Sequence, residues 1–64
     1  MTIKELRKGE YFTRKDIKEP RDNQVWVREE YDRSTRKYYA INFADCSRSI
    51  LLKADTQVFT GFTF

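Results

Sequence analysis

The chain has 64 residues, which is enough for one domain only. It holds one cysteine and no histidine, so an intramolecular disulfide and a zinc site built from cysteine and histidine are both excluded. The net charge of +3 comes from 13 basic and 10 acidic residues that are mixed in sequence, a pattern typical of a solvated surface. The charge alone therefore does not indicate a nucleic-acid partner.

Packing has to stabilise the fold, and the chain contains ten aromatic residues that can each bury about 150–250 Å². The single cysteine, Cys46, favours a reducing compartment. No apolar stretch of the signal-peptide type follows Met1. The longest apolar run, 50–52, is far too short to cross a membrane. We therefore expect a cytoplasmic protein.

The first residues predict a short helical segment. Thr2 and Glu5 have the spacing of a capping box, in which each side chain bonds the other residue's backbone amide. Ile3 and Leu6 lie on one face of such a turn, and Gly9 is well placed to end it in a left-handed conformation. We expect one or two helical turns that cover one end of a β core.

From position 10 onward the pattern is that of strands rich in aromatic and branched residues, separated by polar turns. A loop is expected at 18–23, where Pro20 favours extended geometry in the residue before it. Gly61 indicates a bend or bulge in the last strand. The predicted strands are 10–15, 25–31, 37–43, 49–53 and 57–64.

The two longest strands are joined by a polar hairpin loop, and their register follows from the apolar pattern. If Asp32 opposes Arg36, then Val27 opposes Ile41, and a shift by one residue would scatter the apolar side chains over both faces. The predicted core is therefore the face of the sheet that carries the apolar side chains of these two strands and of the last strand. Its residues are Val27, Ile41, Phe43 and Phe62.

Five short strands with short turns and almost no helix favour an all-β fold, specifically a small five-stranded SH3-like barrel over residues 1–64 with a short N-terminal helical turn. Closing the sheet would also remove the exposed edges that promote aggregation. An open, bent sheet with the helical turn against one face is the alternative.

The chain resembles a group of small uncharacterised proteins of gut bacteria and their mobile elements. The matching segments are Lys8-Gly9-Glu10-Tyr11-Phe12, Val25-Trp26-Val27-Arg28, Glu30-Tyr31-Asp32-Arg33-Ser34 and Val58-Phe59-Thr60-Gly61-Phe62-Thr63-Phe64. The likeness covers most of the chain and implies a compact β domain. The group has no assigned activity, so it implies no functional residue.

Enzymatic activity is not expected. Histidine, the usual acid–base group at neutral pH, is absent, and Cys46 has no histidine to activate it. The two glycines are isolated, so no glycine-rich phosphate loop is present. We expect no catalytic residue, no metal and no cofactor.

Two kinds of binding remain. Small barrels bind single-stranded nucleic acid with exposed aromatics beside a basic groove, and Arg14 and Lys15 are further candidates for phosphate contacts. The alternative is a protein partner, recognised through an aromatic groove or a free strand edge. The candidate binding residues are Trp26, Arg28, Tyr38, Tyr11, Phe59, Arg33, Arg36 and Lys37.

The mixed charge favours a protein partner over nucleic acid, with the chain a monomer or a weak homodimer. The competing interpretation is that the same aromatics form the core, since a chain this short needs most of them inside. Trp26 is the residue on which the interpretations differ most, because on the predicted register it lies away from the main apolar set.

Overall fold

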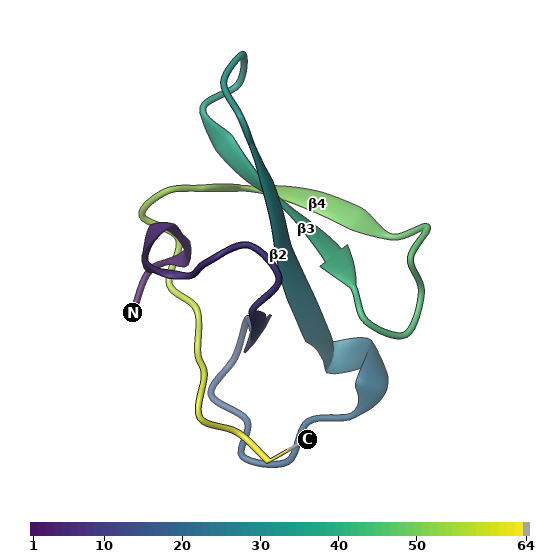
Figure 1. Ribbon diagram of the computed structural model, residues 1–64. Coiled ribbons are helices and arrows are strands. Elements are labelled where there is room, and N and C mark those ends of the chain that lie inside the picture. The colour runs from purple at the N-terminus through teal and green to yellow at the C-terminus, as the bar shows by residue number, and fades with distance from the viewer. Residues whose placement is uncertain (64) are drawn as a thin grey trace.

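The computed structural model describes residues 1–63, which form a four-stranded antiparallel sheet with the strand order β1-β2-β3-β4 (Figure 1). The strands are β1 (Tyr11–Thr13), β2 (Val25–Asp32), β3 (Lys37–Asn42) and β4 (Ser49–Lys53). Two 3₁₀ turns, η1 (Ile3–Glu5) and η2 (Asp22–Gln24), complete the regular structure. The all-β prediction is confirmed, but the sheet is open and has four strands instead of the five of a closed barrel.

The predicted fifth strand is not formed within the described residues. Beyond β4 the chain makes two isolated bridges, Thr2 with Gln57 and Thr13 with Phe59. The backbone groups of Thr13 and Phe59 exchange two hydrogen bonds of 3.0 Å, so the C-terminal segment touches the free edge of β1 at one point. Gly61 follows with a φ of 80°, and the Thr63 amide donates to the Lys18 carbonyl at 2.9 Å in the loop after β1. Phe64 lies outside the described residues. A single bridge to a three-residue strand does not close a barrel.

The N-terminal turn is shorter than predicted. The Glu5 carboxylate accepts a hydrogen bond from the Thr2 amide at 3.1 Å, but the Thr2 hydroxyl has no partner among the described residues, so half of the capping box is made. The turn ends at Leu6, before Gly9. Gly9 does have the predicted left-handed conformation, with φ of 92°, and its amide donates to the Arg28 carbonyl at 2.7 Å. Gly9 therefore connects the N-terminal turn to β1 and is hydrogen-bonded to β2.

The predicted register between β2 and β3 is confirmed at Val27, which lies opposite Ile41. A β-bulge between Arg28 and Tyr31 then places two residues, 29 and 30, opposite the single residue 39. As a result Asp32 lies opposite Lys37 and not opposite Arg36, and the hairpin loop has four residues, 33–36.

The main buried cluster lies on the opposite face of the sheet from the one predicted, although Val25 on the predicted face is fully buried. Val27, Ile41 and Phe62 are only half-buried, and Phe43 is 42% exposed. The N-terminal turn and the C-terminal segment pack against the other face, on the same side of the sheet in Figure 1. The buried cluster consists of Ile3, Leu6, Phe12, Trp26, Ala40, Leu52 and Val58.

Among residues 1–63, no helix is long and apolar enough to cross a membrane. The free thiol of Cys46 is exposed in the loop between β3 and β4.

Candidate functional site

The predicted binding residues do not form one surface. Trp26, Arg28 and Tyr38 share the inner face of the sheet, as the register predicts, but Trp26 is only 7% exposed and belongs to the core. Tyr11 and Lys37 lie on the outer face, because each is directly opposite an outward residue of the neighbouring strand. Trp26 is therefore part of the core cluster.

The remaining predicted residues lie at other places. Arg33 and Arg36 occupy the exposed hairpin loop, with Arg36 at a φ of 58°. Phe59 is half-buried at the edge of β1, held by its bridge to Thr13. The basic residues of the hairpin are thus separated from Trp26, and the groove predicted from the sequence is not assembled.

Arg28 and two tyrosines form a packed cluster on the inner face. The guanidinium carbon of Arg28 lies 4.5 Å from the ring centroid of Tyr38, and the ring of Tyr38 lies 4.8 Å from that of Tyr31 at an angle of 56°. The Arg28 Nε is buried and has no hydrogen-bond partner within residues 1–63. The stacking of a cation on an aromatic ring is therefore the interaction that holds the head group of Arg28.

Apolar side chains cover the centre of the outer face. Val27 and Ile41 are directly opposite on β2 and β3, and Tyr39 and Leu51 are directly opposite on β3 and β4. We call these four residues the outer patch. Tyr39 is 39% exposed and Leu51 is 38% exposed, so large apolar side chains meet solvent here. The edge-to-face pair of Tyr11 and Phe43, with centroids 5.5 Å apart, adjoins the patch.

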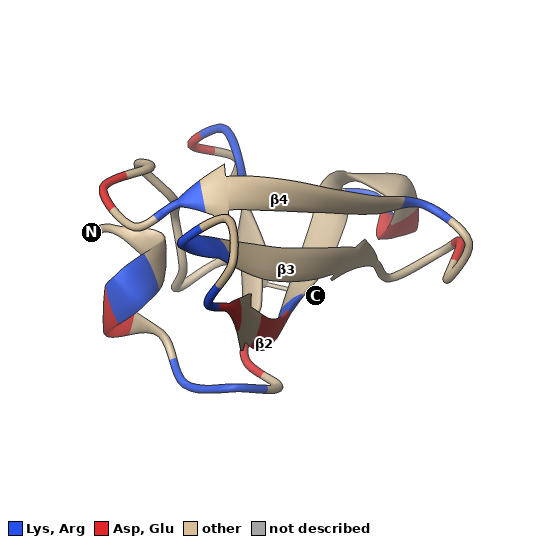
Figure 2. Cartoon of the chain, turned by 90° about the horizontal axis from the view of Figure 1, so that it is seen from above, with Lys and Arg blue, Asp and Glu red and all other residues tan. Residues whose placement is uncertain are grey.

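Two lysines mark one end of the outer patch. Lys37 and Lys53 lie directly opposite each other on β3 and β4, and within residues 1–63 neither forms an ion pair. Asp32 lies opposite Lys37 on its other side, but its carboxylate accepts hydrogen bonds from the Ser34 amide and hydroxyl. Figure 2 shows β3 and β4 uncharged along most of their length, with basic residues at these ends.

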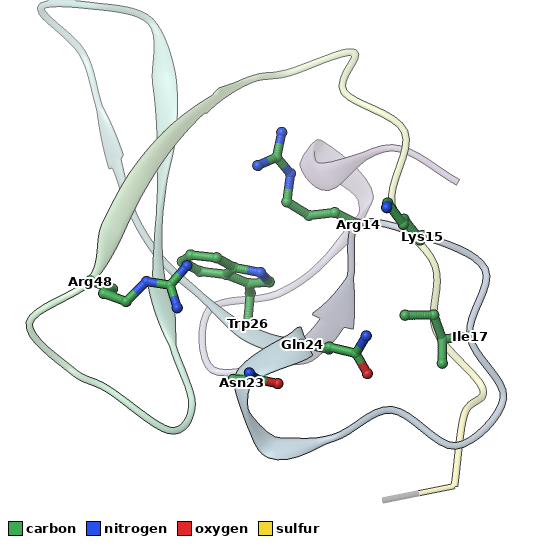
Figure 3. A pocket seen from close by; sticks show the side chains of 7 residues that line it. All are labelled: Arg14, Lys15, Ile17, Asn23, Gln24, Trp26 and Arg48. Atoms are coloured by element: carbon green, nitrogen blue, oxygen red, sulfur yellow. The ribbon is translucent and has the colours of Figure 1, made fainter.

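A pocket of about 560 Å³ opens at the other end of the sheet, next to Trp26 (Figure 3). Four separate segments contribute to it: the loop after β1, η2, β2 and the residues before β4. Three of its side chains are cationic and none is acidic. The lining residues are Arg14, Lys15, Ile17, Asn23, Gln24, Trp26 and Arg48.

A buried asparagine holds two walls of this pocket. The Asn42 side chain, only 1% exposed, donates to the Asn23 carbonyl at 2.9 Å, and its oxygen accepts from the amides of Ala44 and Asp45. The Asn42 backbone amide donates to the Arg48 carbonyl at 2.9 Å. The positions of Asn23 and Arg48 are therefore linked through one buried residue whose side-chain nitrogen and oxygen are both hydrogen-bonded.

A buried threonine holds a third wall. The hydroxyl of Thr13, which is fully buried, donates to the Lys15 carbonyl at 2.6 Å. Thr13 and Asn42 are the two buried polar residues of the described part of the chain. Both use their side chains to fix backbone carbonyls of pocket residues, so the pocket walls are preorganised.

Hydrogen bonds shift the pKa of several exposed carboxyls. The hydroxyl and amide of Ser34 lower the pKa of Asp32, and the same groups of Ser47 lower that of Asp45, with Arg48 adding a smaller effect. Glu30 and Lys8 form an ion pair, which lowers the pKa of Glu30 and raises that of Lys8. Each shift favours the charged form, so none of these groups is a neutral acid or base at neutral pH.

Trp26, Arg14 and Lys15 were predicted as binding residues from the sequence, whereas Arg48, Asn23 and Gln24 were not. Nothing in the local pattern connects Arg48 with Trp26, since 21 intervening residues separate them. The polar residue Asn42, two residues after Ala40 at the end of an apolar strand, is the one signal that a bonded structural link was needed here.

Comparison of the chain with protein-family models, with curated proteins and with solved structures gives no match.

Proposed function

We propose that this domain is a non-catalytic binding module that docks another protein on its outer patch. The observation that carries the proposal is the exposure of Tyr39 and Leu51 beside Val27 and Ile41, across the centre of an open sheet. Contiguous exposed apolar surface of this kind is typical of protein interaction sites.

The alternation along the strands supports a face that is covered in use. An antiparallel sheet with one solvated face normally places polar residues on that face. Here the outward positions of β3 are Lys37, Tyr39 and Ile41, so two of the three are apolar. Tyrosine and aliphatic side chains at the centre and charged side chains at the rim are the composition of an interface.

The lysines indicate the charge of the partner. Lys37 and Lys53 repel each other across the strands, and a carboxylate placed beside them removes that repulsion. In a two-fold arrangement that places these lysines over the opposite end of a second copy, they meet Tyr11, Phe43 and Ser49, none of which carries a carboxylate. The partner we propose therefore carries an apolar patch flanked by acidic residues.

Site-specific photo-crosslinking in cells tests this proposal. A photoreactive phenylalanine replaces either Tyr39 or Tyr31, which are residues of the same type with 39% and 41% exposure on opposite faces of the sheet. Position 39 should crosslink to one partner protein, and position 31 should not. Adding K37E and K53E to the position-39 variant should abolish the crosslink, because carboxylates would then face the acidic rim.

Three results contradict the proposal. Equal crosslinking from positions 31 and 39 would mean that contact is unspecific. Crosslinks from position 39 only to a second copy of the chain would replace the proposed partner by self-association, which sedimentation of the purified domain would confirm. No crosslink from position 39 in cells that contain the folded domain would mean that the patch is not used.

A further inference from the structure

The pocket beside Trp26 gathers three cationic side chains that form no ion pair within the described residues. Arg14, Lys15 and Arg48 line it together, and within residues 1–63 none of the three forms an ion pair with a carboxylate. The nearest acid in sequence to Arg48 is Asp45, whose carboxylate accepts hydrogen bonds from the Ser47 amide at 3.1 Å and hydroxyl at 2.6 Å and which Arg48 affects only as a smaller electrostatic contribution to its lowered pKa. The positive charge of the pocket is therefore available to an anion from solution.

The uncharged groups of the pocket are also suited to an anion. The Gln24 carbonyl oxygen accepts from the Arg21 amide at 2.9 Å, which leaves its amide nitrogen to donate. The indole nitrogen of Trp26 makes no hydrogen bond within residues 1–63 and points toward the space between Arg14 and Gln24 (Figure 3). The pocket thus presents donors from Gln24 and Trp26 beside three cations.

A flat apolar group also has a place there. The guanidinium carbon of Arg48 lies 5.7 Å from the ring centroid of Trp26, so a planar cation covers the indole face. Its outer side can stack on a second planar ring, and Ile17 supplies an apolar wall. The volume of about 560 Å³ lies within the range of roughly 300–1,000 Å³ that small-molecule sites occupy.

From these observations we infer that the pocket binds a nucleoside phosphate, with the phosphate on Arg14, Lys15 and Arg48 and the base against the outer side of the Arg48 guanidinium. The site lies on the inner side of the sheet, away from the outer patch, and does not depend on the proposed protein partner. The nucleoside phosphate has two possible sources, a free nucleotide or one unit of a single-stranded nucleic acid.

Fluorescence of Trp26, the one tryptophan of the chain, measures occupancy directly. The protein is titrated separately with uridine monophosphate, with a short oligothymidylate and with inorganic phosphate. Either nucleotide ligand should change the emission at concentrations where inorganic phosphate does not, because only these ligands carry a base. Saturation by the monophosphate at equal or lower concentration identifies a free nucleotide, and tighter binding of the oligonucleotide identifies a strand.

Variants and salt then locate the contacts. R14Q with K15Q should weaken binding at least about tenfold, since two of three phosphate contacts are lost. The matched control, K4Q with R33Q, removes the same charge from exposed positions outside the pocket and should leave the affinity unchanged. For the oligonucleotide, about a fourfold rise in salt should weaken binding about two- to threefold, at a slope of about −0.7 for the one phosphate that the pocket neutralises.

Amide shifts in an NMR titration should fall on Arg14, Lys15, Gln24, Arg48 and the Trp26 indole. Three results would overturn the inference: no response to either nucleotide ligand, equal losses in the pocket variant and in the control, or equally tight binding of polyglutamate, which carries charge but no base. Circular dichroism of each variant confirms that it is folded. None of these measurements involves position 39. Nucleotide binding can therefore be absent while the outer patch still crosslinks to a partner, and nucleotide binding can be present while the outer patch does not crosslink.

Discussion

Arg28 places its guanidinium 4.5 Å from the ring centroid of Tyr38, on the same face of the sheet as the core. The β-bulge that follows Arg28 brings Tyr31 opposite Tyr38, where the two rings pack at 4.8 Å. The three side chains form a continuous stack from the middle of β2 to the hairpin.

This stack should be measurable as an energetic coupling. We expect a double-mutant cycle of R28M and Y38L to give a coupling of about 0.5–1 kcal/mol, the usual size for a partly exposed cation–π contact. Methionine keeps the apolar stem of Arg28, so the cycle isolates the cation. Urea denaturation of the four proteins provides the values, and additive effects would show that the contact contributes packing only.

The core assignment predicts a large difference between two aromatic residues. F12A should destabilise the domain by about 3–5 kcal/mol, because Phe12 is fully buried, whereas Y39A should change stability by less than about 1 kcal/mol. Since F12A risks complete unfolding, F12L serves as the milder variant and should still shift the denaturation midpoint more than Y39A does. A larger effect of Y39A than of F12L would contradict the observed faces of the sheet.

The hairpin loop should show a local pH dependence. Ser34 lowers the pKa of Asp32 below its ordinary value of 3.8, so the stabilisation from this carboxylate is complete above that pH and is lost as the pH falls through the lower pKa of the folded state. S34A should move the pKa of Asp32 upward, as seen in an NMR titration of the carboxyl carbon. S47A is the matched control, because it should raise the pKa of Asp45 and leave that of Asp32 unchanged.

The facing lysines allow stability and binding to be separated. K53E should stabilise the isolated domain by a few tenths of a kcal/mol, because a like-charged cross-strand pair becomes an opposite one, and K53Q should give a smaller gain. High salt should remove most of the difference between the two variants. A midpoint for K53E below that of the unchanged protein would mean that Lys53 already has a favourable local role. The proposed acidic partner should bind K53E more weakly despite its higher stability.

Much of the sheet could be predicted from the sequence because strand pairing depends on local alternation. The strand 49–53 has the predicted bounds, and Val27 lies opposite Ile41 as predicted. The sharing of one face by Trp26, Arg28 and Tyr38 was also predictable from the period of two. The bulge was not, because a regular ladder satisfies the same pattern. With the bulge, Tyr31 lies on the inner face and the exposed Glu30 pairs with Lys8.

The candidate sites also combine features that the sequence predicts with features that it does not predict. Alternation by itself determined which side chains share a face, but it could not determine which face is covered. That depends on where Ile3, Leu6 and Val58, far from the strands in sequence, pack after folding. These residues cover the side of Trp26 and leave Tyr39 and Leu51 in solvent, which is the reverse of the predicted core.

The sequence by itself therefore determined that the domain is all-β and which residues pair in part of the sheet. It also determined which aromatic and basic residues are present to form a core or a site. Only the tertiary structure decided that Arg48 joins Arg14 and Lys15 beside Trp26, because this pocket is assembled from four segments joined by the bonds of Asn42 and Thr13. Contacts between distant segments depend on the three-dimensional packing of the whole chain, and no local pattern of residues records them.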